Sequence, residues 1–73
     1  MSVLVLCNGV FDCIHVGHIL HLQAAREFGD ILVVSITADE YVNKPGRPIY
    51  PLSHRVAILR ALRCVDDVIV VSG

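Results

Sequence analysis

The stretch that decides the fold is Val3-Leu4-Val5-Leu6-Cys7-Asn8-Gly9-Val10-Phe11-Asp12-Cys13-Ile14-His15-Val16-Gly17-His18. It opens with an uninterrupted apolar run over residues 3–7, and two similar runs follow at residues 31–36 and 68–71. All three are rich in β-branched residues, and none alternates apolar with polar residues. Strands that are buried on both faces of a parallel sheet have this pattern. The sequence therefore predicts three parallel strands.

Two segments between these runs have the spacing of amphipathic helices. Over residues 17–28 and 53–64 the apolar side chains fall largely on one helical face, with polar side chains elsewhere. Gly29 follows the first segment, where glycine ends helices, and Pro51 precedes the second, where proline suits a helix start. The predicted fold is α/β, a Rossmann-like β-α-β-α-β half. Its right-handed crossovers place the three strands of the parallel sheet in the order 3-2-1.

The length and composition of the chain indicate that it forms only part of a domain. The chain has 73 residues, of which 55% are hydrophobic. Because a domain of this size buries only a modest share of its surface, we expect much of this apolar surface to meet something outside the chain. In the predicted topology the first strand has a free edge that awaits a fourth strand, and open apolar edges promote association. We therefore expect residues 1–73 to form a partial domain, completed by a second copy or another partner.

Charge and cysteine content exclude several classes of protein. A net charge of -1 gives no electrostatic reason to bind nucleic acid or an anionic membrane. The apolar runs are well short of the ~20 residues that a membrane helix needs, and the N-terminus lacks the basic region of a signal peptide. The 3 cysteines form no Cys-x-x-Cys pair, and we expect them to be free thiols in a reducing cytoplasm.

The chemistry is expected in the loop after the first strand, because ligands of open α/β sheets bind at the carboxyl ends of strands. Gly9 permits a tight turn and lets backbone N–H groups approach an anion. The following helix start adds free N–H groups and the positive end of a dipole. His15 and His18 can project to the same side, and Gly17 between them leaves room for a phosphate. Two imidazoles at a helix N-terminus can stabilise the charge on a pentacoordinate phosphorus.

The pattern Gly-x-Phe-Asp-x-x-His-x-Gly-His at residues 9–18 resembles the first motif of the cytidylyltransferase-like nucleotidylyltransferases. The similarity continues through residues 46–49 and 61–66. Within this family the chain looks most like the adenylyltransferases that activate heptose 1-phosphate, followed by glycerol-3-phosphate cytidylyltransferases. The resemblance implies the N-terminal half of a nucleotidylyltransferase. Such an enzyme joins a nucleoside monophosphate from ATP or CTP to a phosphorylated small molecule and releases pyrophosphate, with Mg²⁺ as cofactor.

The same resemblance implies roles for individual residues. His15 and His18 are the implied catalytic residues, which contact the triphosphate and stabilise the transition state. Asp12 would help to shape the site, and Arg55 would either stabilise the second crossover or reach the substrate phosphate. The implied nucleotide- and phosphate-binding residues are Gly9, Val10, Phe11, Asp12, Gly17, Lys44, Arg55 and Arg63.

Two other functions stay open from the sequence. Cys13, His15, His18 and His21 together resemble a set of zinc ligands. Their spacing runs across the junction of loop and helix, so we assign no metal ligands among them. The chain could also be a catalytically incomplete remnant that binds a nucleotide or pairs with another subunit through its open sheet edge. A turnover assay separates that remnant from an enzyme, and metal analysis tests the zinc module.

Overall fold

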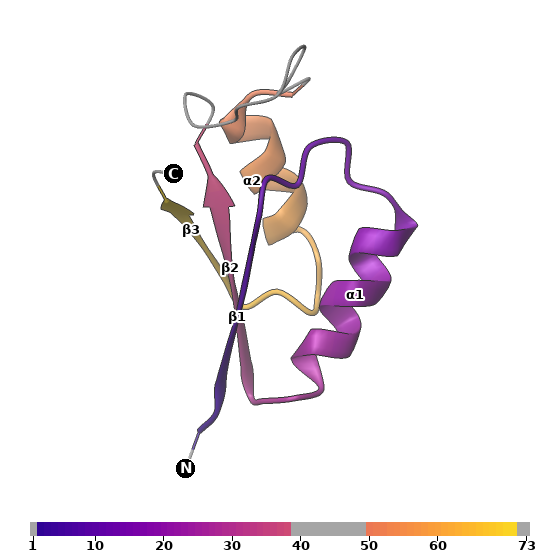
Figure 1. Ribbon diagram of the computed structural model, residues 1–73, viewed down its shortest axis with the longest axis vertical. Coiled ribbons are helices and arrows are strands. Elements are labelled where there is room, and N and C mark those ends of the chain that lie inside the picture. The colour runs from indigo at the N-terminus through magenta and orange to yellow at the C-terminus, as the bar shows by residue number, and fades with distance from the viewer. Residues whose placement is uncertain (1, 39–49, 72–73) are drawn as a thin grey trace.

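The computed structural model describes residues 2–38 and 50–71 of the chain (Figure 1). The elements alternate as predicted, with a helix between each pair of consecutive strands. They are β1 (Leu4–Gly9), α1 (Val16–Arg26), β2 (Ile31–Thr37), α2 (Leu52–Arg60) and β3 (Asp67–Val71). The predicted β-α-β-α-β order and α/β class are confirmed.

The strands form one parallel sheet in the order β1-β2-β3. This is the predicted order 3-2-1, counted from the other edge. At the carboxyl ends of the strands, Gly9 lies opposite Ile36 and Thr37 lies opposite Val71. Both helices lie on the same side of the sheet (Figure 1). The ends of the strands and the starts of both helices therefore share one edge, which we call the carboxyl edge.

The core lies between the helices and the face of the sheet that they cover. β2 contributes Leu32, Val34 and Ile36, and Leu22 of α1 and Leu59 of α2 pack against them. All five side chains are fully buried. Full burial of an aliphatic side chain of this kind stabilises the fold by about 1.5–3 kcal/mol. The middle strand is therefore the centre of the core.

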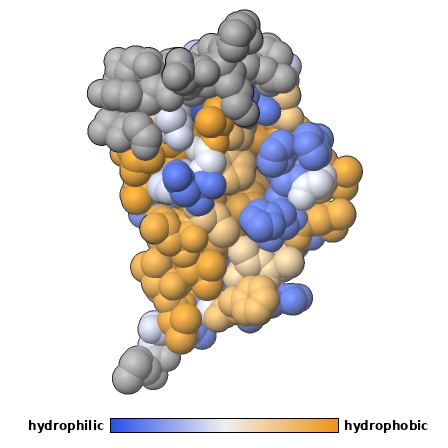
Figure 2. Space-filling model, in the orientation of Figure 1, coloured by the Kyte–Doolittle hydropathy of each residue, from blue (hydrophilic) through white to orange (hydrophobic). Residues whose placement is uncertain are grey.

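The opposite face of the sheet is bare over the described residues. Leu4, Leu6, Ile31 and Ile69 are between 38% and 59% exposed. Figure 2 shows a continuous hydrophobic area beside β1. The apolar runs predict strands that are buried on both faces, and in the described ranges only one face is covered.

Both helices end earlier than their apolar patterns predict. α1 ends at Arg26 and α2 at Arg60, before the predicted ends at residues 28 and 64. After α2, the N–H of Leu62 donates to the carbonyl of Leu59, a tighter turn that ends the regular hydrogen bonding. Phe28 belongs to the apolar pattern of the first helix, yet it is 82% exposed because the helix ends before it.

The amino-terminal edge of the sheet is tied together by Asp66, which lies just before β3. Its carboxylate accepts a hydrogen bond from the N–H of Leu32 at 2.7 Å and pairs with Nε of Arg26 at 3.1 Å. Arg26 also donates to the carbonyl of Gly29 at 2.9 Å. One carboxylate thus joins the end of α1 and the starts of β2 and β3.

Cys7, Cys13 and Cys64 are free thiols, as expected. Within residues 2–38 and 50–71, no helix is long and apolar enough to span a membrane.

Candidate functional site

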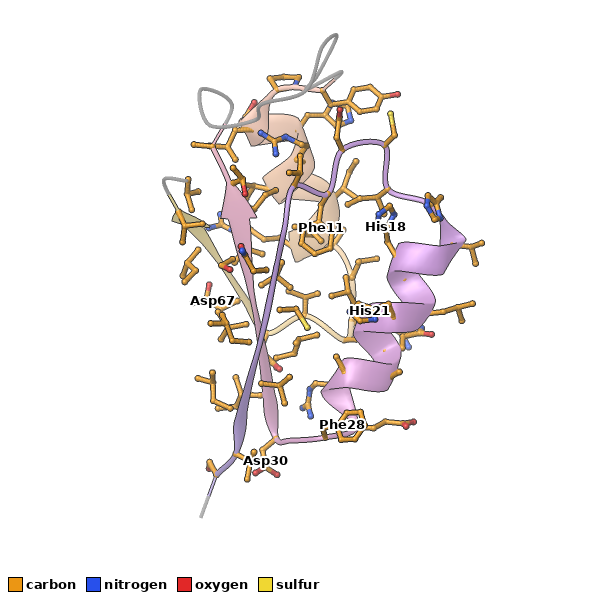
Figure 3. All side chains as sticks on the ribbon, viewed as in Figure 1. Phe11, His18, His21, Phe28, Asp30 and Asp67 are labelled. Carbon is orange, nitrogen blue, oxygen red and sulfur yellow. The ribbon has the colours of Figure 1, made fainter. Side chains whose placement is uncertain are left out.

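The motif residues meet at the carboxyl edge. β1 ends at Gly9, a loop of residues 10–15 follows, and α1 begins at Val16. Figure 3 shows Phe11 and His18 near this edge, between the end of β1 and the first turns of α1, while His21 lies lower along the helix. The loop therefore brings the first strand and the motif histidines to one place.

The two motif histidines form the cap of α1. His15 is the N-cap residue, with extended backbone angles, and its Nδ1 accepts a hydrogen bond from the N–H of Gly17 at 3.0 Å. Nδ1 of His18 accepts in turn from the N–H of His15 at 3.1 Å. This is the reciprocal arrangement of a capping box, with imidazoles in place of a hydroxyl and a carboxylate. The ring centroids lie 4.1 Å apart, so the start of the helix holds the two rings side by side.

These hydrogen bonds determine the tautomer of both rings. A backbone N–H points at each Nδ1, so Nδ1 is unprotonated and the neutral ring carries its proton on Nε2. The pKa of His18 lies below its ordinary value of 6.5, because burial disfavours the charged ring and because His15 and His21 add like charge. At neutral pH His18 is therefore uncharged, and its Nε2–H is a donor that no hydrogen bond in the described ranges uses.

The turn before the histidines is made by residues other than glycine. Phe11 and Cys13 have positive φ angles of 53° and 54°, a conformation that costs a non-glycine residue about 1–3 kcal/mol. The buried Phe11 ring folds back over Gly9, where an added Cβ would lie 2.8 Å from the ring. The prediction that Gly9 makes the tight turn is wrong in this detail. Gly9 instead leaves room for the ring of Phe11.

Gly17 leaves room for a neighbouring ring in the same way. A Cβ on Gly17 would lie 2.7 Å from Cε1 of His15. The N–H of Gly17 donates to His15, so the prediction of free N–H groups at the helix start is wrong for this residue. That Gly17 also leaves room for a phosphate stays a prediction.

Arg55 lies beneath the loop and joins it to the rest of the carboxyl edge. Its side chain is fully buried, and its Nη1 donates to the carbonyls of Val10 at 2.7 Å and Thr37 at 2.9 Å. Its Nε donates to the carbonyl of Tyr50 at 3.2 Å. Asp12 contacts the same segment, because its Oδ1 accepts from the N–H of Tyr50 at 3.0 Å. Of the two predicted roles for Arg55, this geometry favours support of the second crossover.

The remaining predicted residues are not brought to the histidine pair. Arg63 is exposed and lies in the connection from α2 to β3, toward the amino-terminal edge. Lys44 lies outside the described residues. Among the residues that the structure describes, no group of three or more His, Cys, Asp or Glu side chains could hold a metal ion, so the zinc hypothesis gains no support.

Sequence reasoning missed one feature of the site, an exposed pair of stacked rings. The rings of Tyr50 and His54 lie 4.6 Å apart and 16° from parallel. Both side chains are exposed, and the backbone of Tyr50 is bonded to Asp12. The available signal is the spacing, since side chains four residues apart meet on a helix, but Tyr50 precedes the helix, which begins at Leu52.

Known proteins resemble this chain in sequence and in fold. A family model described as cytidylyltransferase-like matches residues 6–73. The Bifunctional protein HldE of Streptomyces coelicolor is 51% identical over 69 residues, which cover 90% of this chain and 15% of that protein. The FAD synthase of Pyrococcus abyssi is 52% identical over 68 residues, which cover 90% of this chain and 46% of that protein.

A solved structure extends the likeness to three dimensions. The lipopolysaccharide core biosynthesis protein of Thermoplasma volcanium superposes with a TM-score of 0.88 at 35% identity, over 97% of this chain and 59% of its own. The chain therefore spans only part of the length of each of these relatives. The family match and the superposed fold agree, and the chain belongs to the cytidylyltransferase-like family of nucleotidyltransferases.

Proposed function

We propose that this chain is the nucleotide-binding half of an enzyme that transfers a nucleoside monophosphate from ATP or CTP to a phosphorylated small molecule. The observation that carries the proposal is the pair of imidazoles at the start of α1, each held through Nδ1 by a backbone N–H. Each ring therefore has its Nε2–H free to donate to a phosphate oxygen.

In the proposed reaction, a phosphomonoester oxygen of the acceptor attacks the α-phosphorus of the nucleotide. A new P–O bond forms to the acceptor, the bond to the β-phosphate oxygen breaks, and pyrophosphate leaves with the electron pair. The imidazoles of His15 and His18 stabilise the negative charge that grows on the phosphoryl oxygens, because they are positioned before the reaction begins. No residue of the chain needs to form a covalent intermediate.

We propose Mg²⁺ as the cofactor, held by Asp12 of the loop together with the substrate phosphates. Mg²⁺ is usually held by one or two carboxylates together with substrate phosphates, and Asp12 supplies a carboxylate in the loop that leads to the histidines. When bound, the ion would neutralise the departing pyrophosphate. Asp12 would then hold both the ion and, through its Oδ1, the backbone of Tyr50.

The acceptor is proposed to be a small phosphomonoester. Sugar 1-phosphates such as heptose 1-phosphate, and glycerol 3-phosphate, are the first candidates from the motif. The relative named FAD synthase adds flavin mononucleotide to the panel, because in FAD an adenylyl group is bonded to the phosphate of that nucleotide, and their two phosphates form the pyrophosphate linkage. All of these acceptors share a nucleophilic phosphate oxygen, so the proposed reaction at the α-phosphorus is the same for each of them.

The proposal is tested by pyrophosphate release from the purified chain with Mg²⁺, ATP or CTP, and each acceptor in turn. Release with one pair identifies the substrates. In that pair His18→Ala should lower the rate by roughly 10²–10³, the usual cost of one transition-state donor. His21→Ala is the matched control, because His21 lies on the same helix outside the motif.

The alternative is a catalytically incomplete module that binds a nucleotide. It predicts that Mg²⁺-ATP or Mg²⁺-CTP binds the folded chain in a calorimetric titration, with no pyrophosphate released for any acceptor. A folded chain that neither binds nucleotide nor releases pyrophosphate would contradict both proposals.

We also propose that the chain works in the cytoplasm with its sheet completed by a second copy or another partner. The support for a partner is the bare face of the sheet, where Leu4 and Leu6 are 59% and 58% exposed, together with the open edge of β1. Sedimentation of the purified chain measures its oligomeric state, and a monomer at all concentrations would contradict the homodimer.

A further inference from the structure

Arg55 is the only charged side chain with 0% exposure among the described residues. A guanidinium is costly to bury unless most of its N–H groups find acceptors. Its acceptors include the main-chain carbonyls of Val10, Thr37 and Tyr50, at 2.7, 2.9 and 3.2 Å. Hydrogen bonds that involve a charged group are stronger than neutral ones, so this cation holds its three carbonyls firmly.

The three carbonyls belong to three different segments of the carboxyl edge. Val10 is the first residue after β1, Thr37 is the last residue of β2, and Tyr50 lies just before α2. A residue of the second crossover therefore fixes the point where the first loop leaves the sheet. Because β2 is the centre of the core, Arg55 transfers the rigidity of the core to that loop.

The loop needs such support because it is strained. Phe11 and Cys13, with φ angles of 53° and 54°, are held in a conformation that relaxes unless the surroundings fix it. Arg55 fixes Val10 on one side of Phe11, and the N–H of Tyr50 fixes Asp12 on the other. The carbonyl of the same Tyr50 accepts from Arg55. Arg55 thus holds the strained turn on both sides, directly at Val10 and through Tyr50 at Asp12.

We propose that Arg55 is a positioning residue, which sets the loop so that the imidazoles of His15 and His18 reach the nucleotide phosphates, and that it does not itself contact the nucleotide. The inference rests on the proposed function only for the identity of the ligand. The clamp on the loop exists without a ligand and is tested without one.

The first experiment compares Arg55→Lys with Arg60→Lys by ¹H–¹⁵N NMR of the chain without ligand. Lysine keeps the charge but lacks the planar fork that reaches carbonyls in different directions. Arg60 lies on the same helix and is exposed, so its variant is the matched control. We expect the amide signals of Phe11 and Cys13 and the ring signals of His15 to move in the first variant only. Unchanged loop signals in folded Arg55→Lys would overturn the inference.

The second experiment uses the wild-type chain, so it holds even where Arg55→Lys does not fold. The Nε–H of Arg55 donates to the carbonyl of Tyr50 and should give a signal protected from exchange with water. On titration with Mg²⁺-ATP, the ring signals of His15 and His18 should shift while the Nε–H signal of Arg55 stays in place. An Nε–H signal that shifts as strongly as the ring signals would overturn the inference and indicate direct phosphate contact.

The two experiments separate this inference from the proposed function. If the ring signals do not respond to Mg²⁺-ATP or Mg²⁺-CTP, the proposed function fails, while the comparison of Arg55→Lys with Arg60→Lys still decides whether Arg55 positions the loop. Where nucleotide does bind, Arg55→Lys should weaken its affinity by on the order of ten- to a hundredfold, since small displacements of binding groups have effects of this size. Arg60→Lys should leave the affinity unchanged.

Discussion

Two substitutions at His15 separate the capping role of its imidazole from its proposed role toward phosphate. Nδ1 of His15 accepts the N–H of Gly17 at 3.0 Å. In His15→Asn, the amide oxygen occupies nearly the same position and accepts the same N–H, because it is attached to the same Cγ. In His15→Ala no acceptor remains. Both substitutions remove Nε2 and the contact with the ring of His18, so comparing them isolates the cap.

The expected difference in stability follows from the energy of a helix cap. Loss of a side-chain N-cap costs about 0.5–2 kcal/mol, and asparagine is among the best capping residues. We therefore expect the free energy of unfolding of His15→Ala to be lower than that of His15→Asn by about 1 kcal/mol. In a domain of this size that difference lowers Tm by roughly 4–8 °C. Thermal unfolding followed by circular dichroism measures it.

The expected difference in ligand binding has another pattern. Both substitutions remove the Nε2–H donor, and a hydrogen bond to a charged group contributes about 1.5–3 kcal/mol. The affinity for Mg²⁺-ATP should fall at least about tenfold in both variants. His21→Asn, an exposed position on the same helix, should change neither stability nor affinity. Equal stability of the two His15 variants would refute the capping argument, and wild-type affinity of His15→Asn would refute the role of Nε2.

Three further predictions follow from other contacts. Gly9→Ala places a Cβ 2.8 Å from the buried ring of Phe11, and chemical denaturation should show a loss of about 1–3 kcal/mol, typical of overpacking; an unchanged midpoint would contradict the close approach. Asp66→Ala removes the acceptor for the N–H of the buried Leu32 and should cost about 1–3 kcal/mol. Asp66→Asn keeps an oxygen acceptor and should cost less than about 1 kcal/mol, the usual value of an exposed ion pair; equal costs would show that the ion pair dominates. The pKa of His18 is lowered in the folded chain, so the unfolded chain binds the proton more readily. The contribution of His18 to the free energy of unfolding is therefore fully present above about pH 6.5, and it is lost as the pH falls through the lowered pKa. His18→Asn should reduce this slope in denaturation measured from pH 8 to pH 5, and an identical slope would contradict it.

The order of the elements and the position of the histidine pair could be predicted because both depend on local patterns. Continuous β-branched runs occur in buried strands, and apolar residues at helical spacing occur in α1 and α2. The ends of the helices were less predictable, since Phe28 keeps the apolar spacing after the hydrogen bonding of α1 has ended. In that case the apolar spacing continues past the residue at which the helical hydrogen bonds end.

Contacts between distant segments could not be predicted in the same way. The roles of Arg55 depend on carbonyls of Val10 and Thr37, which lie 45 and 18 residues away in sequence. Nothing in the type of either residue marks its carbonyl as an acceptor. The positive φ angles of Phe11 and Cys13 were also hidden, because glycine is the usual residue for that conformation and Gly9 was present as the obvious candidate.

In the proposed function, the capping imidazoles change how the start of α1 would attract a phosphate. A helix start usually offers free N–H groups to an anion, but here the N–H of Gly17 donates to His15 and the N–H of His15 donates to His18. Each backbone N–H polarises the ring that accepts it, and hydrogen bonds in a chain strengthen one another, so Nε2–H on the far side becomes a stronger donor. The positive end of the helix is thus extended outward by the length of an imidazole. Aspartate is a better cap than histidine, but it would repel a phosphate while accepting the same N–H. The proposed phosphate role would therefore account for histidine at this position.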